Sequence, residues 1–133
     1  MERRTLLLCG LLALTGCGST GPRRTPGVGS AAPGDRIAAL ADVPAGSGAL
    51  VDMPGDGQLL LVRGDGADAA VRAFNPACPH QGTVVNPPAA GVITCPTHRS
   101  TFDPTSGAVL SGPSPSGLTE VPVRVSGQDV LLG

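Results

Sequence analysis

Short apolar or alternating runs, separated by Gly, Pro and Asp, follow one another along the chain from Ile37 onward. Runs of this length without a convincing helical period are typical of β-strands. Several are separated by glycine-containing turn sequences, in which glycine supplies positive φ where a turn needs it. We therefore expect an all-β fold, an antiparallel β sandwich or a partly open barrel. The expected strands cover residues 49–53, 59–63, 69–74, 91–94, 108–110, 119–125 and 130–132, and the expected turns 54–57, 64–66 and 126–129.

Residues 1–16 have the order of groups found in a signal peptide: Arg3 and Arg4, an apolar run at 6–14, and then small residues. The run is too short to cross a bilayer, which takes about 20 apolar residues. Residues 14–17 resemble the lipobox of bacterial lipoproteins, in which the cysteine thiol receives the lipid. This resemblance implies lipidation at Cys17 and a position on the extracytoplasmic face of the bacterial cytoplasmic membrane. The paired arginines also resemble a twin-arginine signal, and the residues leave this route and the general export route open.

The next stretch, residues 17–35, is crowded with Gly, Pro, Ser, Thr and Arg and offers little to bury. Such composition is typical of a flexible tether. The chain of 133 residues has room for one ordinary domain besides these segments. We expect that domain at residues 36–133.

Charge and aromatic content limit what the domain binds. The net charge is -1, lysine is absent, and Phe74 and Phe102 are the two aromatic residues among Phe, Tyr and Trp. A basic stripe and stacking platforms are therefore missing, so we expect no nucleic-acid partner. A small core of Val, Leu, Ile and Ala also gains from a metal crosslink.

Two short segments hold the residues with metal-binding chemistry. Cys78 and His80 stand in one and Cys95 and His98 in the other, and together they use both histidines and every cysteine beyond Cys17. Proline follows each of these cysteines and stiffens a turn. Thiolate and imidazole on each of two loops suit an iron–sulfur cluster or a tetrahedral zinc site, while Cys78 and Cys95 alone suit a disulfide in an oxidising compartment.

The pattern Cys-x-His followed by Cys-x-x-His resembles the Rieske family over residues 42–132. The resemblance implies a Rieske-type antiparallel β sandwich with two cluster-binding loops and a [2Fe–2S] cluster. It places Cys78 and Cys95 on the inner iron and His80 and His98 on the outer, so that electrons enter and leave at the histidines. Rieske centres lie at about −150 to +300 mV, because imidazoles remove negative charge from the cluster.

Further positions match the family after the second motif. Ser100, Phe102 and Asp103 stand where Ser, Tyr or Phe, and Asp occur, and residues 112–115 resemble the proline-containing loop that covers the cluster. The resemblance implies that the Ser100 hydroxyl donates to the cluster and raises its potential. Phe102 lacks the second hydroxyl donor that Tyr supplies, so we expect a potential between those of oxygenase ferredoxins and respiratory proteins.

Other positions depart from the family. Thr83 and Thr97 stand where respiratory members have a disulfide, and Arg99 stands where glycine usually follows the second histidine. The positive charge of Arg99 favours reduction of the cluster. Its Cβ strains the loop if the position requires positive φ.

Zinc sites usually combine a Cys-x-x-Cys pair with closely spaced histidines, whereas each loop here holds one cysteine and one histidine. A disulfide between Cys78 and Cys95 would leave both histidines unexplained. No dinucleotide-binding glycine motif, nucleophile with a base, or spare histidine indicates substrate chemistry. We expect an electron carrier with redox proteins as partners and a lipid anchor in the membrane, and no enzyme in the isolated chain. The alternative is the Rieske subunit of a larger oxidoreductase, such as a quinol-oxidising cytochrome bc-type complex.

Overall fold

The computed structural model describes residues 24–64 and 70–133, and these residues confirm an all-β fold. The strands are β1 (Thr25–Pro26), β2 (Arg36–Ala39), β3 (Ser47–Met53), β4 (Gly57–Arg63), β5 (Val71–Phe74), β6 (Ile93–Thr94), β7 (Thr101–Phe102), β8 (Val109–Ser111), β9 (Glu120–Val121), β10 (Val123–Ser126) and β11 (Asp129–Leu132), and the 3₁₀ helices are η1 (Leu40–Asp42) and η2 (Pro54–Asp56). Within these ranges no helix is long and apolar enough to span a membrane.

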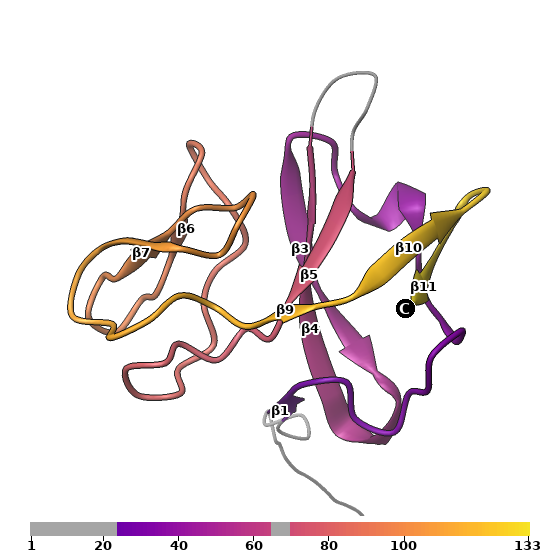
Figure 1. Ribbon diagram of the computed structural model, residues 1–133, viewed down its shortest axis with the longest axis horizontal. Coiled ribbons are helices and arrows are strands. Elements are labelled where there is room, and N and C mark those ends of the chain that lie inside the picture. The colour runs from indigo at the N-terminus through magenta and orange to yellow at the C-terminus, as the bar shows by residue number, and fades with distance from the viewer. Residues whose placement is uncertain (1–23, 65–69) are drawn as a thin grey trace, which may run out of the picture.

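The strands form two lobes, which lie side by side in Figure 1. The base lobe holds a five-stranded sheet, ordered β1-β4-β5-β9 with β3 also paired to β4, and a three-stranded sheet ordered β10-β11-β2. The loop lobe, residues 75–119, holds the three-stranded sheet β6-β7-β8. All these pairs are antiparallel except the short β1–β4 pair, which is parallel.

Strand β4 lies between two cores. Leu59 and Leu61 belong to the core between the two base sheets, and Leu60 and Val62 belong to the core between the base and the loop lobe. Successive strand side chains point to opposite faces, so a strand covered on both sides reads as a continuous apolar run. The second core also contains both phenylalanines and two cysteines; its buried members are Leu60, Val62, Phe74, Cys78, Val85, Ile93, Cys95, Phe102 and Leu118.

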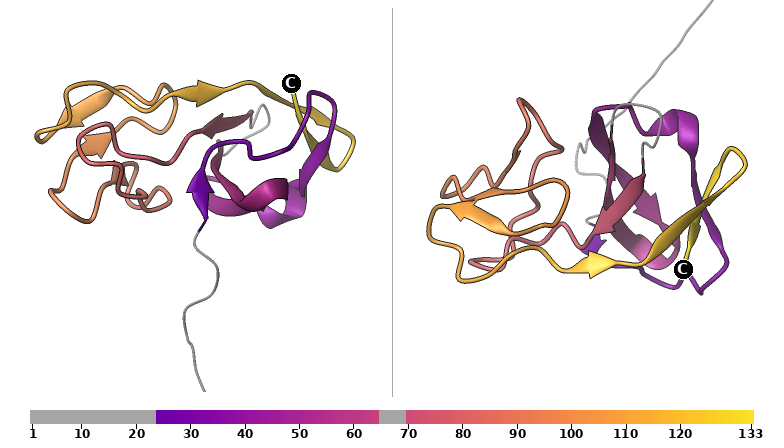
Figure 2. Two further views of the ribbon diagram at one scale, coloured as in Figure 1. Left: turned by 90° about the horizontal axis from the view of Figure 1, so that it is seen from below. Right: turned by 45° about the horizontal axis from the view of Figure 1, so that its top comes forward.

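The loop lobe leaves the base after β5 and returns immediately before β9, as the two views of Figure 2 confirm. Because β5 pairs with β9, the two crossings lie together, and the Asn75 amide donates to the Thr119 carbonyl at 2.8 Å. We call this pair of crossings the neck. It fixes the lobe to the base at both ends of the segment that carries the candidate ligands.

The observed strands differ from the expected ones where proline or very short strands occur. The expected strand at 119–125 is wrong as a single element, because Pro122 separates β9 in one sheet from β10 in the other. Proline has no amide hydrogen for a ladder and marks the point where the chain changes sheets. Strands β2 and β7 were not expected. The expected turn at 64–66 lies largely outside the described residues.

The described part of the expected tether, residues 24–35, lies against the base lobe. Arg24 contacts Asp52 at 3.4 Å and donates to the Met53 carbonyl, and the Ser30 amide donates to the Pro54 carbonyl at 2.8 Å. Val28 and Ala31 pack against the core between the base sheets. This part therefore differs from a free tether. The expected signal peptide and Cys17 lie outside the described residues.

Candidate metal centre

The first motif forms a tight loop at residues 78–83. The Cys78 amide donates to the Thr83 carbonyl at 2.8 Å, and the Gly82 amide donates back to the Cys78 carbonyl at 2.7 Å. Gly82 has φ 76°, the left-handed region that glycine enters without steric cost. We call this arrangement the loop frame.

The second motif repeats the loop frame at residues 95–100. The Cys95 amide donates to the Ser100 carbonyl at 2.8 Å, and the Arg99 amide donates to the Cys95 carbonyl at 2.9 Å. Arg99 is the fifth residue of this frame, as Gly82 is of the first, and it has φ 63°. The sequence raised the question of whether this position needs positive φ, and it does. A side chain with Cβ costs about 1 kcal/mol there.

The two frames direct both thiols inward. Cys78 and Cys95 are each 2% exposed, and both belong to the core that joins the lobes. Both are free cysteines. The disulfide alternative is therefore wrong for this structure, and two thiols remain available as ligands.

The imidazoles lie together farther out. The ring centroids of His80 and His98 are 4.8 Å apart, with the ring planes at 75°. His80 is half-buried and His98 is exposed. Among the described residues, no three His, Cys, Asp or Glu side chains gather around a point where one metal ion would bind. A tetrahedral zinc needs four ligands around one ion, and a two-iron cluster needs two ligands at each iron.

Ser100 is the last residue of the second loop frame and is fully buried. Its Oγ accepts a hydrogen bond from the Ser114 amide at 3.1 Å, and among the described residues no acceptor takes its hydroxyl proton. The loop that carries Ser114 lies close to Ser100, because a Cβ on Gly112 would approach the Ser100 Cα to 2.5 Å. The hydroxyl is thus held from one side and keeps a proton to donate. Together with two thiols and two imidazoles, this donor set fits a [2Fe–2S] cluster.

A side-chain hydrogen bond joins the two frames. The Thr97 hydroxyl donates to the Thr83 hydroxyl oxygen at 2.9 Å. These are the two positions at which the resemblance noted in the sequence places a disulfide in respiratory members of the family. The sequence identified both positions but gave no sign of the contact, because it joins residues 14 positions apart.

The loop lobe has few charges. Between residues 75 and 119, Arg99 and Asp103 are the charged residues apart from the histidines. The side-chain hydroxyl of Thr105 and then its backbone amide donate to Asp103 Oδ1 at 2.6 and 2.7 Å, and they lower the pKa of Asp103 below its usual range. Arg99 is exposed and makes no salt bridge or side-chain hydrogen bond with another described residue.

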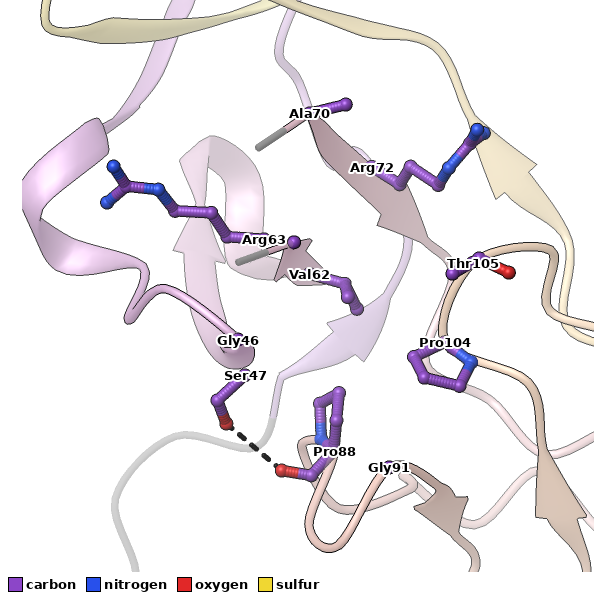
Figure 3. Close-up of a pocket in the computed structure, with 11 residues that line it drawn as sticks. Gly46, Ser47, Val62, Arg63, Ala70, Arg72, Pro88, Gly91, Pro104 and Thr105 are labelled. Carbon is purple, nitrogen blue, oxygen red and sulfur yellow. Dashed lines mark hydrogen bonds between the residues drawn. The ribbon is translucent and has the colours of Figure 1, made fainter. Parts of the chain in front are cut away.

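A cavity of about 340 Å³ lies where the lobes meet, away from the cysteines and histidines. Figure 3 shows its walls, with the Ser47 hydroxyl bound to the Pro88 carbonyl and the guanidinium groups of Arg63 and Arg72 pointing away from each other. The lining residues are Gly46, Ser47, Val62, Arg63, Gly64, Ala70, Arg72, Pro88, Gly91, Pro104 and Thr105. None of the candidate ligands lines it, so the metal centre and this junction are separate features.

Known proteins are similar to this chain, among them the following three. The plasma membrane Rieske protein PetC3 from Synechocystis PCC 6803 is 32% identical with a TM-score of 0.63, and the match covers 74% of this chain and 98% of that one. The ferredoxin of carbazole 1,9a-dioxygenase from Nocardioides aromaticivorans IC177 is 27% identical with a TM-score of 0.59, and the match covers 77% of this chain and 98% of that one. A Haloferax mediterranei protein named as a Rieske subunit of a respiratory nitrate reductase is 37% identical over 65 residues, which are 48% of this chain and 30% of that protein.

The family model of the Rieske [2Fe-2S] domain matches residues 36–122. This range includes both loop frames and most of the two lobes, and a Rieske domain binds a [2Fe–2S] cluster and carries electrons. The chain therefore belongs to the Rieske [2Fe–2S] domain family.

Proposed function

We propose that Cys78, Cys95, His80 and His98 hold the [2Fe–2S] cluster and that the chain carries single electrons between redox proteins as a free-standing, membrane-anchored carrier. The observation that supports this most is the pairing of two buried, free thiols with two imidazoles 4.8 Å apart on matching loop frames. When bound, such a cluster supplies one-electron redox chemistry.

The loop frames assign different work to the two ligand pairs. The thiols lie in an apolar core, which excludes water from the sulfur ligands. The imidazoles lie toward solvent and provide the surface at which an approaching redox protein comes nearest to the cluster. The Ser100 hydroxyl would donate a hydrogen bond to a bound cluster and would favour its reduced, more negative state.

The membrane anchor rests on the sequence around Cys17 and on the apolar run that precedes it. We propose that Cys17 becomes the lipid-modified N-terminus and holds the carrier on the extracytoplasmic face of the bacterial cytoplasmic membrane. A relative named as a plasma membrane Rieske protein supports a membrane setting. A few acyl chains anchor a protein stably where one chain does not.

A second candidate function is that of a subunit in a larger oxidoreductase, such as a quinol-oxidising complex. The name of the Haloferax relative, a subunit of a respiratory nitrate reductase, favours it. The carbazole dioxygenase ferredoxin favours the free-standing carrier, because the match covers 98% of that small protein. Co-purification of the full chain with a cytochrome would favour the subunit.

The ligand assignment is tested on reconstituted full-length protein by iron and sulfide analysis and by electron paramagnetic resonance after reduction. We expect iron and sulfide in equal amounts and a paramagnetic signal, and we expect His80→Ala and His98→Ala each to remove the signal. Gln81→Ala is the matched control, because it alters an exposed residue of the same loop. Wild-type protein without iron, or an unchanged spectrum in His80→Ala, contradicts the assignment.

The anchor is tested by labelling cells that express the full chain with a radioactive fatty acid. We expect label on the wild type and none on Cys17→Ser, which should leave the membrane fraction after export. Label that persists in Cys17→Ser contradicts lipidation at this residue.

A further inference from the structure

Arg99 holds a strained backbone conformation next to a candidate ligand. Its φ of 63° lies in the left-handed region, and it directly follows His98. The matching position of the other frame is Gly82, with φ 76° and no atom within 4 Å of where a Cβ would stand. The space at position 82 would therefore admit a side chain, and the positive φ is what favours glycine there.

The arginine side chain gains nothing from the rest of the described structure to offset this strain. It is exposed, and no described carboxylate or carbonyl binds its guanidinium group. Two other described residues that are not glycine have positive φ: Asp56, of a type that tolerates the region, and Ala90, in a two-residue hairpin turn. Strain that persists without an internal gain is found at sites that act on another molecule.

The surroundings make the charge of Arg99 effective. Asp103 is the one other charged residue of the loop lobe apart from the histidines, and its carboxylate already accepts two hydrogen bonds from Thr105. The exposed residues around His98 in the two frames are otherwise proline, glycine, threonine and glutamine. Within the two frames Arg99 is thus the one residue with a fixed charge, and it stands next to the imidazole of His98 in the sequence.

We propose that Arg99 is the recognition residue for an acidic surface on the redox partner and pairs with a carboxylate there when the partner contacts the imidazoles. This inference rests on the proposed electron-carrier function. Guanidinium groups bind carboxylates with two parallel hydrogen bonds, so the pair also orients the partner over His98. The base lobe carries charges of both signs, so we expect the charge of Arg99 to set the preference for anions around His98.

The experiment uses reduced, cluster-loaded full-length protein and two small one-electron oxidants of opposite charge, ferricyanide and tris(1,10-phenanthroline)cobalt(III). In each reaction one electron leaves the protein, iron(III) or cobalt(III) of the complex is reduced, and no bond forms or breaks. At low salt we expect Arg99→Gln to slow oxidation by the anion about fivefold and to leave oxidation by the cation unchanged or faster. Salt should remove the difference.

Two variants control for general effects. Arg124→Gln removes an exposed arginine from β10 of the base lobe and should leave both rates unchanged. Arg99→Lys keeps the charge and should retain most of the rate with the anion. Equal slowing by Arg124→Gln overturns the inference, since the effect would then follow net charge alone.

Redox potential and thermal unfolding give readouts beyond the electron-transfer rate. If Arg99 acts on the cluster alone, Arg99→Gln changes the potential and shifts the rates with both oxidants in the same direction, which overturns the inference. Arg99→Gly should raise the unfolding midpoint by a few degrees while it slows oxidation by the anion as Arg99→Gln does. A structural role alone predicts a normal rate in Arg99→Gly.

Iron analysis before each measurement separates the two levels of failure. Wild-type protein without iron overturns the proposed function and this inference with it. If the wild type and the variants are loaded with iron and Arg99→Gln changes the oxidation rate with neither oxidant, this inference alone is overturned.

Discussion

The two loop frames, residues 78–83 and 95–100, share one backbone geometry and differ in the side chains that fill it. The fifth residue has positive φ in both, but it is Gly82 in one and Arg99 in the other. The sixth residue is Thr83, whose hydroxyl binds Thr97 across the loops, or Ser100, whose hydroxyl is buried and held by Ser114. In both frames the backbone positions the candidate ligands. The fifth and sixth side chains have different roles in the two frames: a hydrogen bond between the loops in the first, and a surface charge and a buried hydroxyl in the second.

A third copy of the frame shows that this geometry needs no metal. The Asp103 amide donates to the Ala108 carbonyl at 2.8 Å, the Gly107 amide donates to the Asp103 carbonyl at 2.7 Å, and Gly107 has φ 78°. Here the first residue is an aspartate that binds Thr105 of its own loop. The turn is therefore a local solution of the backbone, and the residue at its first position decides whether it offers a metal ligand.

The sixth positions should differ most in their effect on the redox potential. Ser100→Ala removes the hydroxyl donor and should lower the potential by roughly 60 to 130 mV, which corresponds to about 1.5 to 3 kcal/mol for a hydrogen bond to a charged group. Thr83→Ala, at the same place in the other frame, should leave the potential nearly unchanged. A redox titration followed by circular dichroism measures both. Equal shifts would mean that the two hydroxyls act alike and would remove the difference between the frames.

The fifth positions should differ in their tolerance of a Cβ. Gly82→Ala places a Cβ at φ 76° and should lower the free energy of unfolding by about 1 kcal/mol, although the space around it is open. Arg99→Ala already starts from a strained residue and should change stability by less than about 0.5 kcal/mol. Urea unfolding of the two loaded variants gives the comparison. A larger loss in Arg99→Ala would mean that the arginine side chain stabilises the fold.

The bond between the frames should contribute a smaller coupling. Thr83→Val and Thr97→Val each break it, and a double-mutant cycle should give about 0.5 kcal/mol, the low end for a net hydrogen bond because Thr97 is exposed. Thiol reductants should leave the unfolding of the wild type unchanged, in contrast to a protein with a disulfide at this place. A coupling indistinguishable from zero would leave the ligand loops held by their backbones alone.

The third frame should give the smallest effect, and it depends on pH. The hydrogen bonds from Thr105 lower the pKa of Asp103, so the folded state favours the carboxylate more than the unfolded state does. The stability gained in this way is present above the ordinary aspartate pKa of about 3.9 and is lost as pH falls through the lowered value. The stability difference between wild type and Asp103→Asn should therefore narrow below about pH 4. A difference that stays constant from pH 7 to pH 3 would contradict this.

The sequence predicted the parts of the fold that depend on local pattern. The run Leu59 to Val62 indicated a strand, and the turn at 126–129 became the tight β10–β11 connection, because apolar runs and glycine turns act over a few residues. It did not predict β2, β7 or the docking of residues 24–35. These depend on pairing with distant segments, and a stretch of Gly and Pro reads as a linker until its partner is known.

For the candidate site, motif spacing identified the four ligand candidates, and the structure adds how they lie. The positive φ of Arg99 follows from its match to Gly82, which requires the hydrogen bonds of both frames. The contacts of Ser114 with Ser100 and of Thr97 with Thr83 each cross 14 positions, a separation at which no residue pattern indicates contact. Assignments at Cys17 stay predictions, since that residue lies outside the described ranges.

The neck at Asn75 and Thr119 has a consequence for how the protein is built. When β5 pairs with β9, the pairing closes a loop of about 45 residues, which costs roughly 3 kcal/mol of chain entropy. The pairing of the sheet offsets this cost, so cluster binding does not have to. Loading of the metal thus begins from ends that are already joined. Because the neck is closed by the sheet, the loop lobe can lengthen, shorten or be exchanged during evolution while the sheets of the base lobe keep their register.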